Sequence, residues 1–466
     1  MTGHAVVSES TAHLRRRVAD LMGRAREELA ELVAMRSVAD PRQFPPEECD
    51  RAATWVADHF AGVGFGDVRL TPMPDGSRAV IGSRPCGDPD APTVLLYAHY
   101  DVQPPLDETS WRTPPFRLTD VDGRWYGRGA ADCKGNIVAH LTALRALGDE
   151  VAVNLKVVVE GSEEQGTGGL EQFVPENADL LRADTIRVAA TGNAAVGRPG
   201  ITVSLRGVVD AVVTVDALRS ELHCGIFGGA APDGLAALVI MLATLWDEHG
   251  NLDVDGLRSA EVWSGEPYPA ERFRSDGGVL DGLSLLGDGS VSDMLWARPA
   301  LTVVGIDCPP VVGSSTSIVP RARARVNLRI PPGVTPERAA AALREHLQAA
   351  APWGVHLAVD VTAASRPFRG VSTGPAYQRM AAAMQAVHGV APVELGQGGS
   401  IPLCSVLTDT YPAAEIILIG VEEPLTLIHA PNESVAPTEI ADMALAEALF
   451  LRSPSSVQSP PTGEGE

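Results

Sequence analysis

The chain has 466 residues, of which 45% are hydrophobic and 5% aromatic, and its formal net charge is −22 at pH 7. This length predicts two domains, because single hydrophobic cores stop growing well before it. The strong negative charge argues against nucleic acid or an anionic membrane as a partner, and no stretch has the apolar length of a membrane span. The six cysteines are scattered without a CxxC pair, which favours reduced thiols and a cytoplasmic location.

In chain order, the N-terminus indicates an amphipathic helix from about Ser10 without the apolar core of a secretory signal. Strand and helix patterns then alternate, which predicts an α/β fold with a mainly parallel sheet. A different pattern, with few strands and two helices, predicts an inserted α+β layer, in which the structure of about 250–300 is left open. We therefore expect a catalytic domain of residues 1–205 and 375–455, an inserted domain of residues 206–374 and a disordered tail of residues 456–466.

Four polar clusters follow predicted strands of the sheet. They contain His99 and Asp101, then Asp132, then Glu163 and Glu164, and finally His429. Taken singly, each has a plainer explanation, such as a structural histidine or an N-cap aspartate. Together, at one edge of a parallel sheet, they indicate a two-metal cage suited to Zn²⁺, Mn²⁺ or Co²⁺. One glutamate of the adjacent pair can bind metal while the other remains free as a base.

Six ordered motifs resemble those of the M20 metallopeptidases, over about residues 20 to 450. They read "YAHYDVQP", "GRGAADCKGN", "EGSEEQGTGGL", "ELHCGIFGGAAPD", "GGSIP" and "HAPNES". The resemblance is closest to the dipeptidase and carnosinase-like branch. It implies a zinc-exopeptidase-like catalytic domain, an inserted two-layer α+β domain that acts as lid and dimerisation surface, and metal-dependent hydrolysis of a dipeptide or N-acyl amino acid amide bond.

The resemblance also implies residue roles in the catalytic domain. His99 and Asp132 would bind one metal, and Asp132 would bridge to a second metal held by Glu164 and His429. Glu163 would be the general base for the attacking water, and Asp101 would orient His99.

Further roles fall in or near the inserted domain. The resemblance implies that His223 reaches the active site of a partner subunit and stabilises the oxyanion, so a homodimer is expected. Arg329, Gly399 and Ser400 would hold the carboxylate of a small-molecule or dipeptide substrate, and Thr316 matches a weaker lid position.

One residue departs from the family pattern at the first metal. A third protein ligand, an aspartate, is expected where this chain has Ala190, and a methyl group cannot bind metal. Two protein ligands hold a cation less well than three, so one or two metals per chain are expected, with the content nearer one. Cys133 stands where an acid or amide is usual, but as a substitute ligand it is disfavoured because its side chain, directly after Asp132, should point elsewhere.

Two functions therefore remain open. The first is amide hydrolysis with water activated by Glu163, with only one tightly bound metal. The second is a repurposed M20-like protein that catalyses another reaction on an amino-acid-like substrate, or only binds it. The change Ala190→Asp discriminates between them, since a large gain in dipeptidase activity would favour repurposing. A purely structural role is disfavoured because Glu163, Asp101 and His223 persist together.

Overall fold

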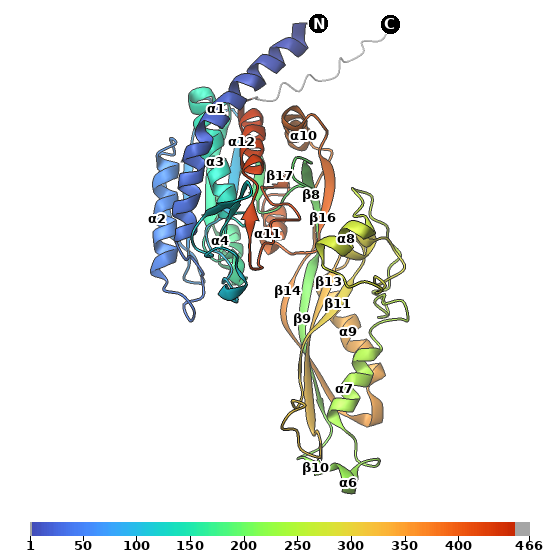
Figure 1. Ribbon diagram of the computed structural model, residues 1–466. Coiled ribbons are helices and arrows are strands. Elements are labelled where there is room, and N and C mark those ends of the chain that lie inside the picture. Colours follow the sequence, from blue (N-terminus) through green and yellow to red (C-terminus); the bar gives the residue numbers. More distant parts are fainter. Residues whose placement is uncertain (1, 453–466) are drawn as a thin grey trace, which may run out of the picture. The chain divides into compact units, whose positions relative to one another are not determined.

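A computed structural model describes residues 2–452, with side chains from residue 11 onward, and divides them into two compact units (Figure 1). Unit 1 comprises residues up to 203, residues 370–395 and residues from 406 onward. Unit 2 comprises residues 204–369 and 396–405, so the short segment 396–405, which lies within the predicted catalytic segment 375–455, falls in unit 2. The predicted tail, 456–466, lies outside the described residues.

Unit 1 is built on a mixed sheet in the order β1-β2-β6-β3-β7-β17-β8. Its four central strands, β6, β3, β7 and β17, are parallel to their neighbours within that group, which confirms the predicted α/β fold with a mainly parallel sheet. Its strands are β1 (Arg69–Pro72), β2 (Arg78–Arg84), β3 (Thr93–His99), β6 (Asn154–Glu160), β7 (Thr185–Ala189), β17 (Glu415–Ile419) and β8 (Gly200–Leu205), the last of which runs on into unit 2. Strand β3 is buried from Val94 onward, as expected of an apolar strand covered on both faces.

Helices cover this sheet and pack on one another. Helix α3 contacts α1, α12 and strand β3, while α2 contacts β1 and β2. The helices of unit 1 are α1 (Thr2–Ala34), α2 (Glu47–Ala61), α3 (Lys134–Leu147), α4 (Gly169–Glu176), α5 (Ala178–Leu181), α10 (Pro375–His388) and α12 (Pro437–Arg452), and α11 (Pro402–Thr410) begins in unit 2. Short elements complete it: β4 (Thr119–Val121), β5 (Arg124–Tyr126), β18 (Ser434–Val435), η1 (Glu108–Ser110), η2 (Gly148–Glu150) and η3 (Glu163–Gln165). Between residues 2 and 452 no helix has the length and apolarity to cross a membrane.

Unit 2 is an antiparallel sheet in the order β11-β13-β9-β14, with helices α7 and α9 packed against it. Strand β13 alternates exposed and buried residues, because one face of the sheet meets the helices and the other meets solvent. Its elements are β9 (Gly207–Asp216), β10 (Leu222–His223), α6 (Cys224–Phe227), α7 (Gly234–Ala243), α8 (Ala270–Asp276), η4 (Asp293–Ala297), β11 (Ala300–Asp307), β12 (Ser317–Ile318), β13 (Arg321–Ile330), α9 (Pro336–Ala350), η5 (Pro352–Gly354), β14 (His356–Ser365) and β15 (Phe368–Arg369), while β16 (Val393–Gln397) joins the two units.

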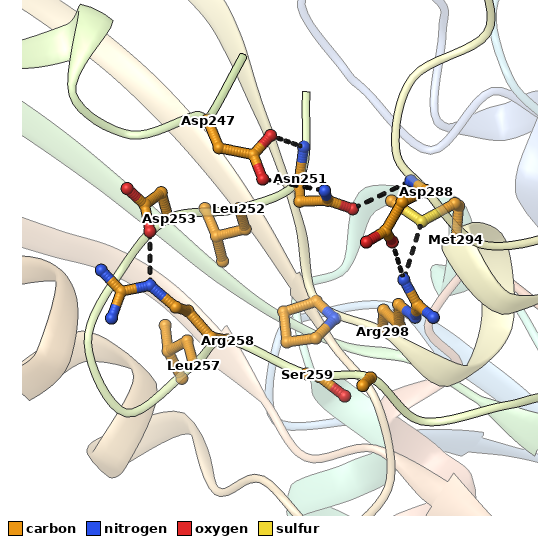
Figure 2. A pocket seen from close by; sticks show the side chains of 12 residues that line it. Asp247, Asn251, Leu252, Asp253, Leu257, Arg258, Ser259, Asp288, Met294 and Arg298 are labelled. Atoms are coloured by element: carbon orange, nitrogen blue, oxygen red, sulfur yellow. Dashed lines mark hydrogen bonds and ion pairs between the residues drawn. The ribbon is translucent and has the colours of Figure 1, made fainter. Parts of the chain in front are cut away.

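A cavity of about 370 Å³ lies within unit 2, in the region whose structure the sequence left open (Figure 2). Its polar side chains are directed at one another. The Asn251 amide donates to Asp247 at 2.9 Å, and the Arg298 guanidinium pairs with Asp288 at 2.6 Å. Because these charges are neutralised within the lining, the cavity offers a ligand few unsatisfied groups.

Candidate metal centre and active site

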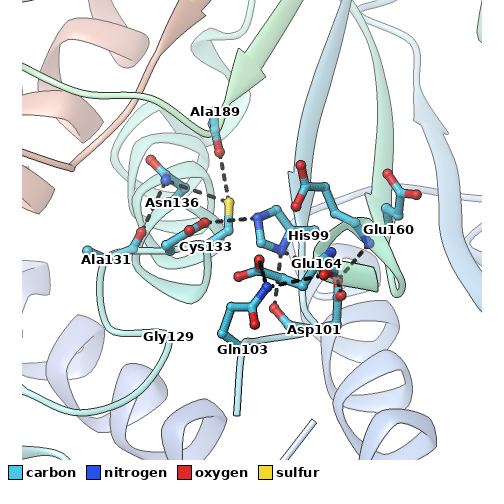
Figure 3. A network of polar contacts seen from close by, with 12 residues as sticks. His99, Asp101, Gln103, Gly129, Ala131, Cys133, Asn136, Glu160, Glu164 and Ala189 are labelled. Atoms are coloured by element: carbon cyan, nitrogen blue, oxygen red, sulfur yellow. Dashed lines mark hydrogen bonds and ion pairs between the residues drawn. The ribbon is translucent and has the colours of Figure 1, made fainter. Parts of the chain in front are cut away.

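Two neighbouring strands of unit 1 bring three of the predicted polar residues to one edge of its sheet. His99 ends β3 and lies opposite Glu160, the last residue of β6, in a parallel pairing. Beyond Glu160 the chain turns into the short helix η3, which begins with Glu163 and Glu164. Both strands therefore end at the same edge, and their functional side chains gather there (Figure 3).

Asp132 is the centre of the cluster. Its Oδ1 lies 3.0 Å from His99 Nε2, and its Oδ2 lies 3.0 Å from His429 Nε2. The same His429 nitrogen is 3.2 Å from Glu164 Oε2. One carboxylate thus faces two histidines from opposite sides, as expected of a group that bridges two cations. The four residues that the sequence nominated as metal ligands are brought together.

Glu433 holds the loop that carries Asp132, and sequence reasoning missed it. Its carboxylate accepts hydrogen bonds from the backbone N–H groups of Gly129, Ala131 and Asp132 at 2.9, 3.1 and 3.1 Å. Arg128 donates to the same carboxylate at 2.8 Å, and both side chains are 1% exposed. The only sequence signal was the position of Glu433 inside "HAPNES", four residues after His429.

Asp101 links His99 to the glutamate pair. Its carboxylate accepts hydrogen bonds from the backbone N–H groups of Glu163 at 3.2 Å and Glu164 at 3.0 Å. The backbone oxygen of Asp101 is 3.1 Å from His99 Nδ1, and its Oδ1 is 3.4 Å away. Asp101 therefore fixes both the imidazole ring and the turn that presents the two glutamates, a wider role than the orientation of His99 alone.

The electrostatics of the cluster favour positive charge. Burial lowers the pKa of His429, but hydrogen bonds to Asp132 and Glu164 outweigh it and raise that pKa to about 11. Burial raises the pKa of Asp132, yet the hydrogen bonds from His429 and His99 bring it below its ordinary value. A divalent cation would supply the same charge in place of the imidazole protons.

The donor set fits a divalent cation. Imidazole nitrogens and carboxylate oxygens are the ligands of Zn²⁺, Mn²⁺ and Co²⁺ in proteins. The ligand atoms of Asp132, Glu164 and His429 all lie within 4.8 Å of one another. Glu164 Oε1 is buried and has no hydrogen-bond donor in the part of the chain that the structure describes. Such an unpartnered carboxylate oxygen is costly unless a cation faces it.

Glu163 is placed to move a proton. Burial is the main cause that raises its pKa to about 8, and the neighbouring carboxylates of Glu164, Asp132 and Asp101 add to the shift, while the charge of His99 opposes it. A carboxylate with a pKa in the neutral range can take a proton from water and return it to a leaving group.

Cys133 does not point away from the cluster, so that expectation was wrong. Its Sγ, the nearest His99 nitrogen and a carboxylate oxygen of Asp132 lie within 4.8 Å of one another, and all three side chains are buried. The backbone turn just before α3 directs consecutive side chains into the same pocket, which the extended-chain argument from sequence did not allow for. Ala190, after the end of β7, places only a methyl group at the expected ligand position.

Glu422 is a second acidic residue that sequence reasoning missed near this edge. Strands β17 and β7 pair in parallel up to Ile419 and Ala189, and an isolated bridge then pairs Glu422 with Gly192. Its side chain is buried, and the charges of Asp132, His429 and His99 act on its carboxyl group. A signal existed, because Glu422 and Glu423 form a second glutamate pair after a predicted strand.

The remaining predicted residues lie in unit 2. They are His223, Thr316, Arg329, Gly399 and Ser400. His223 is exposed, and its Nδ1 accepts a hydrogen bond from Gly225 N at 3.1 Å. Thr316 accepts a backbone hydrogen bond from Cys224 at 2.9 Å, and Ser400 Oγ is 2.7 Å from Ser365 Oγ.

Arg206, which sequence reasoning missed, is close to Arg329 within unit 2. Burial, together with the charge of Arg329, lowers the pKa of Arg206 to about 10. Its Nη2 lies 2.7 Å from the position that a Cβ on Gly398 would take, and its buried Nε has no partner among the described residues. Arg206 lies beside the "GGSIP" loop and Arg329 is close to Arg206, and such a pair of guanidinium groups suits a carboxylate. The sequence signal was an arginine directly after a strand, in the segment "SLRG" at the end of β8.

Histidines and carboxylates gathered at the carboxyl edge of a parallel sheet, with a half-buried glutamate beside them, are the arrangement of a metal-dependent hydrolase. The model of peptidase family M20/M25/M40 matches residues 95–453, and the chain belongs to this family. Membership confirms the predicted family and the predicted class of enzyme, a hydrolase that acts on peptide bonds.

Individual relatives are dipeptidases. The chain is 42% identical over 434 residues to the cysteinylglycine-S-conjugate dipeptidase of Corynebacterium striatum, with 91% of this chain and 94% of the relative covered. It superposes on the crystal structure of human carnosine dipeptidase 1 with a TM-score of 0.79 and 25% identity, covering 95% of this chain and 98% of the other. The dipeptidase Dug1p from Saccharomyces cerevisiae shares the fold, with a TM-score of 0.81, 22% identity and coverage of 96% and 98%.

Proposed function

We propose that this chain hydrolyses the amide bond of a dipeptide or an N-acyl amino acid with the help of divalent cations, Zn²⁺ or else Mn²⁺ or Co²⁺. The observation that carries the proposal is the convergence of His99, Asp132, Glu164 and His429, with the half-buried Glu163 beside them. A cation bound there would polarise the amide carbonyl and lower the pKa of water.

The chain's own residues would divide the remaining work. Glu163 would accept a proton from the attacking water and deliver it to the leaving amine, for which a pKa of about 8 is suitable. Asp101 would keep Glu163, Glu164 and His99 in position through its contacts with all three. Because the carboxylate of Asp132 lies between the two histidines, it would fix the position of the His99 side of the metal centre relative to the His429 side.

Substrate recognition is assigned to unit 2. We propose that Arg329, Gly399 and Ser400 hold the substrate's carboxylate, with Arg206 as an additional cation and Thr316 at the lid. His223, which is exposed, would stabilise the oxyanion in the active site of a partner subunit of a homodimer. The six cysteines are free, which supports a cytoplasmic location because disulfides seldom persist there.

The names of relatives support a small peptide as substrate. The Corynebacterium striatum relative is a cysteinylglycine-S-conjugate dipeptidase, and a rat relative that is 28% identical over 437 residues is a Beta-Ala-His dipeptidase. The alternative of a repurposed protein that acts on another amino-acid-like substrate rests mainly on Ala190, with smaller departures such as Cys133, and the comparisons do not support it better.

The test is a hydrolysis screen with product analysis. Protein loaded with Zn²⁺, Mn²⁺ or Co²⁺ is given Cys-Gly, β-Ala-His, other dipeptides and N-acetyl amino acids. We expect cleavage of at least one dipeptide, and we expect Glu163→Gln to lower kcat by about 10²–10⁴-fold without loss of metal. The exposed Glu176→Gln, in α4, serves as the control and should leave kcat unchanged. Absence of hydrolysis with every metal, or full activity in Glu163→Gln, would reject the proposal.

A further inference from the structure

Cys133 lies in the same buried pocket as the two ligands left at the first metal position. It precedes α3, follows Asp132 directly and is fully buried. Its Sγ lies within 4.8 Å of a His99 nitrogen and an Asp132 oxygen. Around Zn²⁺ a sulfur and a nitrogen ligand stand roughly 3.5 Å apart, since the bonds are about 2.3 and 2.0 Å long. A shift of at most about 1.3 Å, the difference between 4.8 and 3.5 Å, therefore suffices to bring the sulfur and the nitrogen onto one cation.

Cys133 and Ala190, the two departures from the family pattern, are neighbours, because the Cys133 side chain contacts the peptide bond that precedes Ala190. Cys133 Sγ donates a hydrogen bond to the backbone oxygen of Ala189 at 2.8 Å, and that oxygen belongs to the peptide bond that leads into Ala190 (Figure 3). The sulfur thus lies against the backbone position from which the family's aspartate would project. On its other side, Asn136 Nδ2 donates toward the sulfur at 3.6 Å, a contact that a thiolate would keep.

An unpartnered carboxylate oxygen and a further buried acid in the same region point independently to a cation that binds there. Glu164 Oε1 is buried without a donor. Glu422, which is 6% exposed, is a further acid close enough for the charges of Asp132 and His429 to act on its carboxyl group. Buried carboxyl oxygens without partners are uncommon in folded proteins, so positive charge is expected here when the protein is loaded.

We propose that Cys133 is a ligand of the first divalent cation, together with His99 and Asp132, and replaces the aspartate that Ala190 does not supply. The inference rests on the proposed function in one respect, that a cation binds at this edge of the sheet. On binding, the thiol releases its proton to the solvent, and the metal–sulfur bond replaces the hydrogen bond to Ala189. With three protein ligands restored, two tightly bound metals per chain are expected instead of nearly one.

A sulfur ligand also changes which metal is chosen. Thiolates favour Zn²⁺ and Co²⁺, whereas Mn²⁺ prefers carboxylate and carbonyl oxygen. The first position should therefore discriminate strongly against Mn²⁺, while the Asp132, Glu164 and His429 position, which has only nitrogen and oxygen donors, should accept all three metals.

The experiment is a titration of metal-free protein with Co²⁺, followed by near-ultraviolet absorbance and by equilibrium dialysis. In the natural protein we expect two equivalents, one of which brings a sulfur-to-cobalt charge-transfer band. Cys133→Ser should remove the band and weaken one equivalent by more than about 100-fold, beyond the roughly 10–100-fold cost of losing an outer hydrogen-bond partner. Cys86→Ser is the matched control, because Cys86 is only partly buried and lies at the end of β2, outside the cluster, and it should retain both band and stoichiometry.

Three results would overturn the inference. The first is two tight equivalents with no charge-transfer band. The second is an unchanged titration of Cys133→Ser. The third is loss of the equivalent in Glu422→Gln with the sulfur band absent throughout, which would assign the third ligand to a carboxylate.

A rescue variant guards against misfolding, and a separate assay isolates the proposed function. The double variant Cys133→Ser/Ala190→Asp should regain the second equivalent without the band, and circular dichroism should show native secondary structure. Failure of this folded variant to bind a second Co²⁺ would count against the inference. Dipeptide hydrolysis is measured in parallel: activity without a sulfur band refutes the thiolate ligand alone, and a sulfur band without hydrolysis refutes the proposed activity alone.

Discussion

The change Glu433→Gln should destabilise unit 1 strongly. In the native chain the Glu433 carboxylate accepts hydrogen bonds from Arg128 at 2.8 Å and from three backbone N–H groups at 2.9, 3.1 and 3.1 Å. The amide of the variant side chain would keep one acceptor oxygen, but its NH₂ group would face some of the N–H donors that the carboxylate now accepts from. Arg128, 1% exposed, then loses its counter-charge, although its Nη2 keeps the backbone oxygens of Pro104 and Ala430 at 3.1 and 3.2 Å.

The magnitude follows from these contacts. Breaking a buried ion pair by removing one partner costs about 3–5 kcal/mol, and each backbone N–H left without an acceptor adds about 1–3 kcal/mol. We therefore expect the free energy of unfolding to fall by at least about 3–5 kcal/mol, the pair cost alone. Arg128→Met/Glu433→Gln should be more stable than Glu433→Gln, because the unpaired charge is gone.

The assay is urea unfolding followed by circular dichroism at pH 7, with chelator present so that metal binding does not contribute. Asp179→Asn is the control, because Asp179 and Arg182 form an exposed pair at 2.8 Å and no measurable loss is expected. The reasoning fails if Glu433→Gln unfolds within about 1 kcal/mol of the natural chain, a difference typical of exposed sites. It also fails if the double variant is no more stable than the single one.

Three further predictions concern pH, positioning and metal. Burial, and then the charge of Arg187, holds the pKa of His140 well below its ordinary value. Below about pH 6.5 the unfolded chain therefore binds a proton on His140 that the folded chain does not bind. The free energy of unfolding should fall by about 1.4 kcal/mol for each pH unit below that value. His140→Asn should flatten this slope in urea titrations, and an unchanged slope would exclude His140 as its source. Asp101→Asn should lower kcat or metal affinity by about 10–100-fold, measured with zinc-loaded protein, whereas full activity would show that the contacts with Glu163 and Glu164 are dispensable. Chelation should abolish hydrolysis, and Zn²⁺ or Co²⁺ should restore it further than Mn²⁺ does; equal recovery with all three would contradict a sulfur ligand.

The fold could be predicted because its signals are local. Apolar runs such as Thr93–His99, each followed by a helical pattern, indicate parallel strands without any knowledge of the tertiary contacts. The candidate ligands His99, Glu164 and His429 could be nominated for the same reason, since polar residues after strands of a parallel sheet must share one edge. Asp132 reaches the cluster differently, from the loop after β5, which belongs to a separate three-stranded sheet.

Other features depend on contacts that no local pattern encodes. Arg128 and Glu433 form a pair across 305 positions, so neither residue indicates its partner in the sequence. The direction of Cys133 depends on the turn before α3, which the spacing from Asp132 does not determine. The membership of residues 396–405 in unit 2 follows from three-dimensional packing, because in the sequence they lie within an α/β pattern.

The long separation between Glu433 and the loop it supports has a consequence for synthesis. As the nascent chain leaves the ribosome, the segment from Arg128 to Asp132 emerges some three hundred residues before its acceptor. During that interval the second unit, continuous apart from residues 396–405, can already be folding. The cluster around Asp132 therefore cannot be completed until "HAPNES" has been synthesised, and translation arrested before this segment leaves a polypeptide that cannot assemble it.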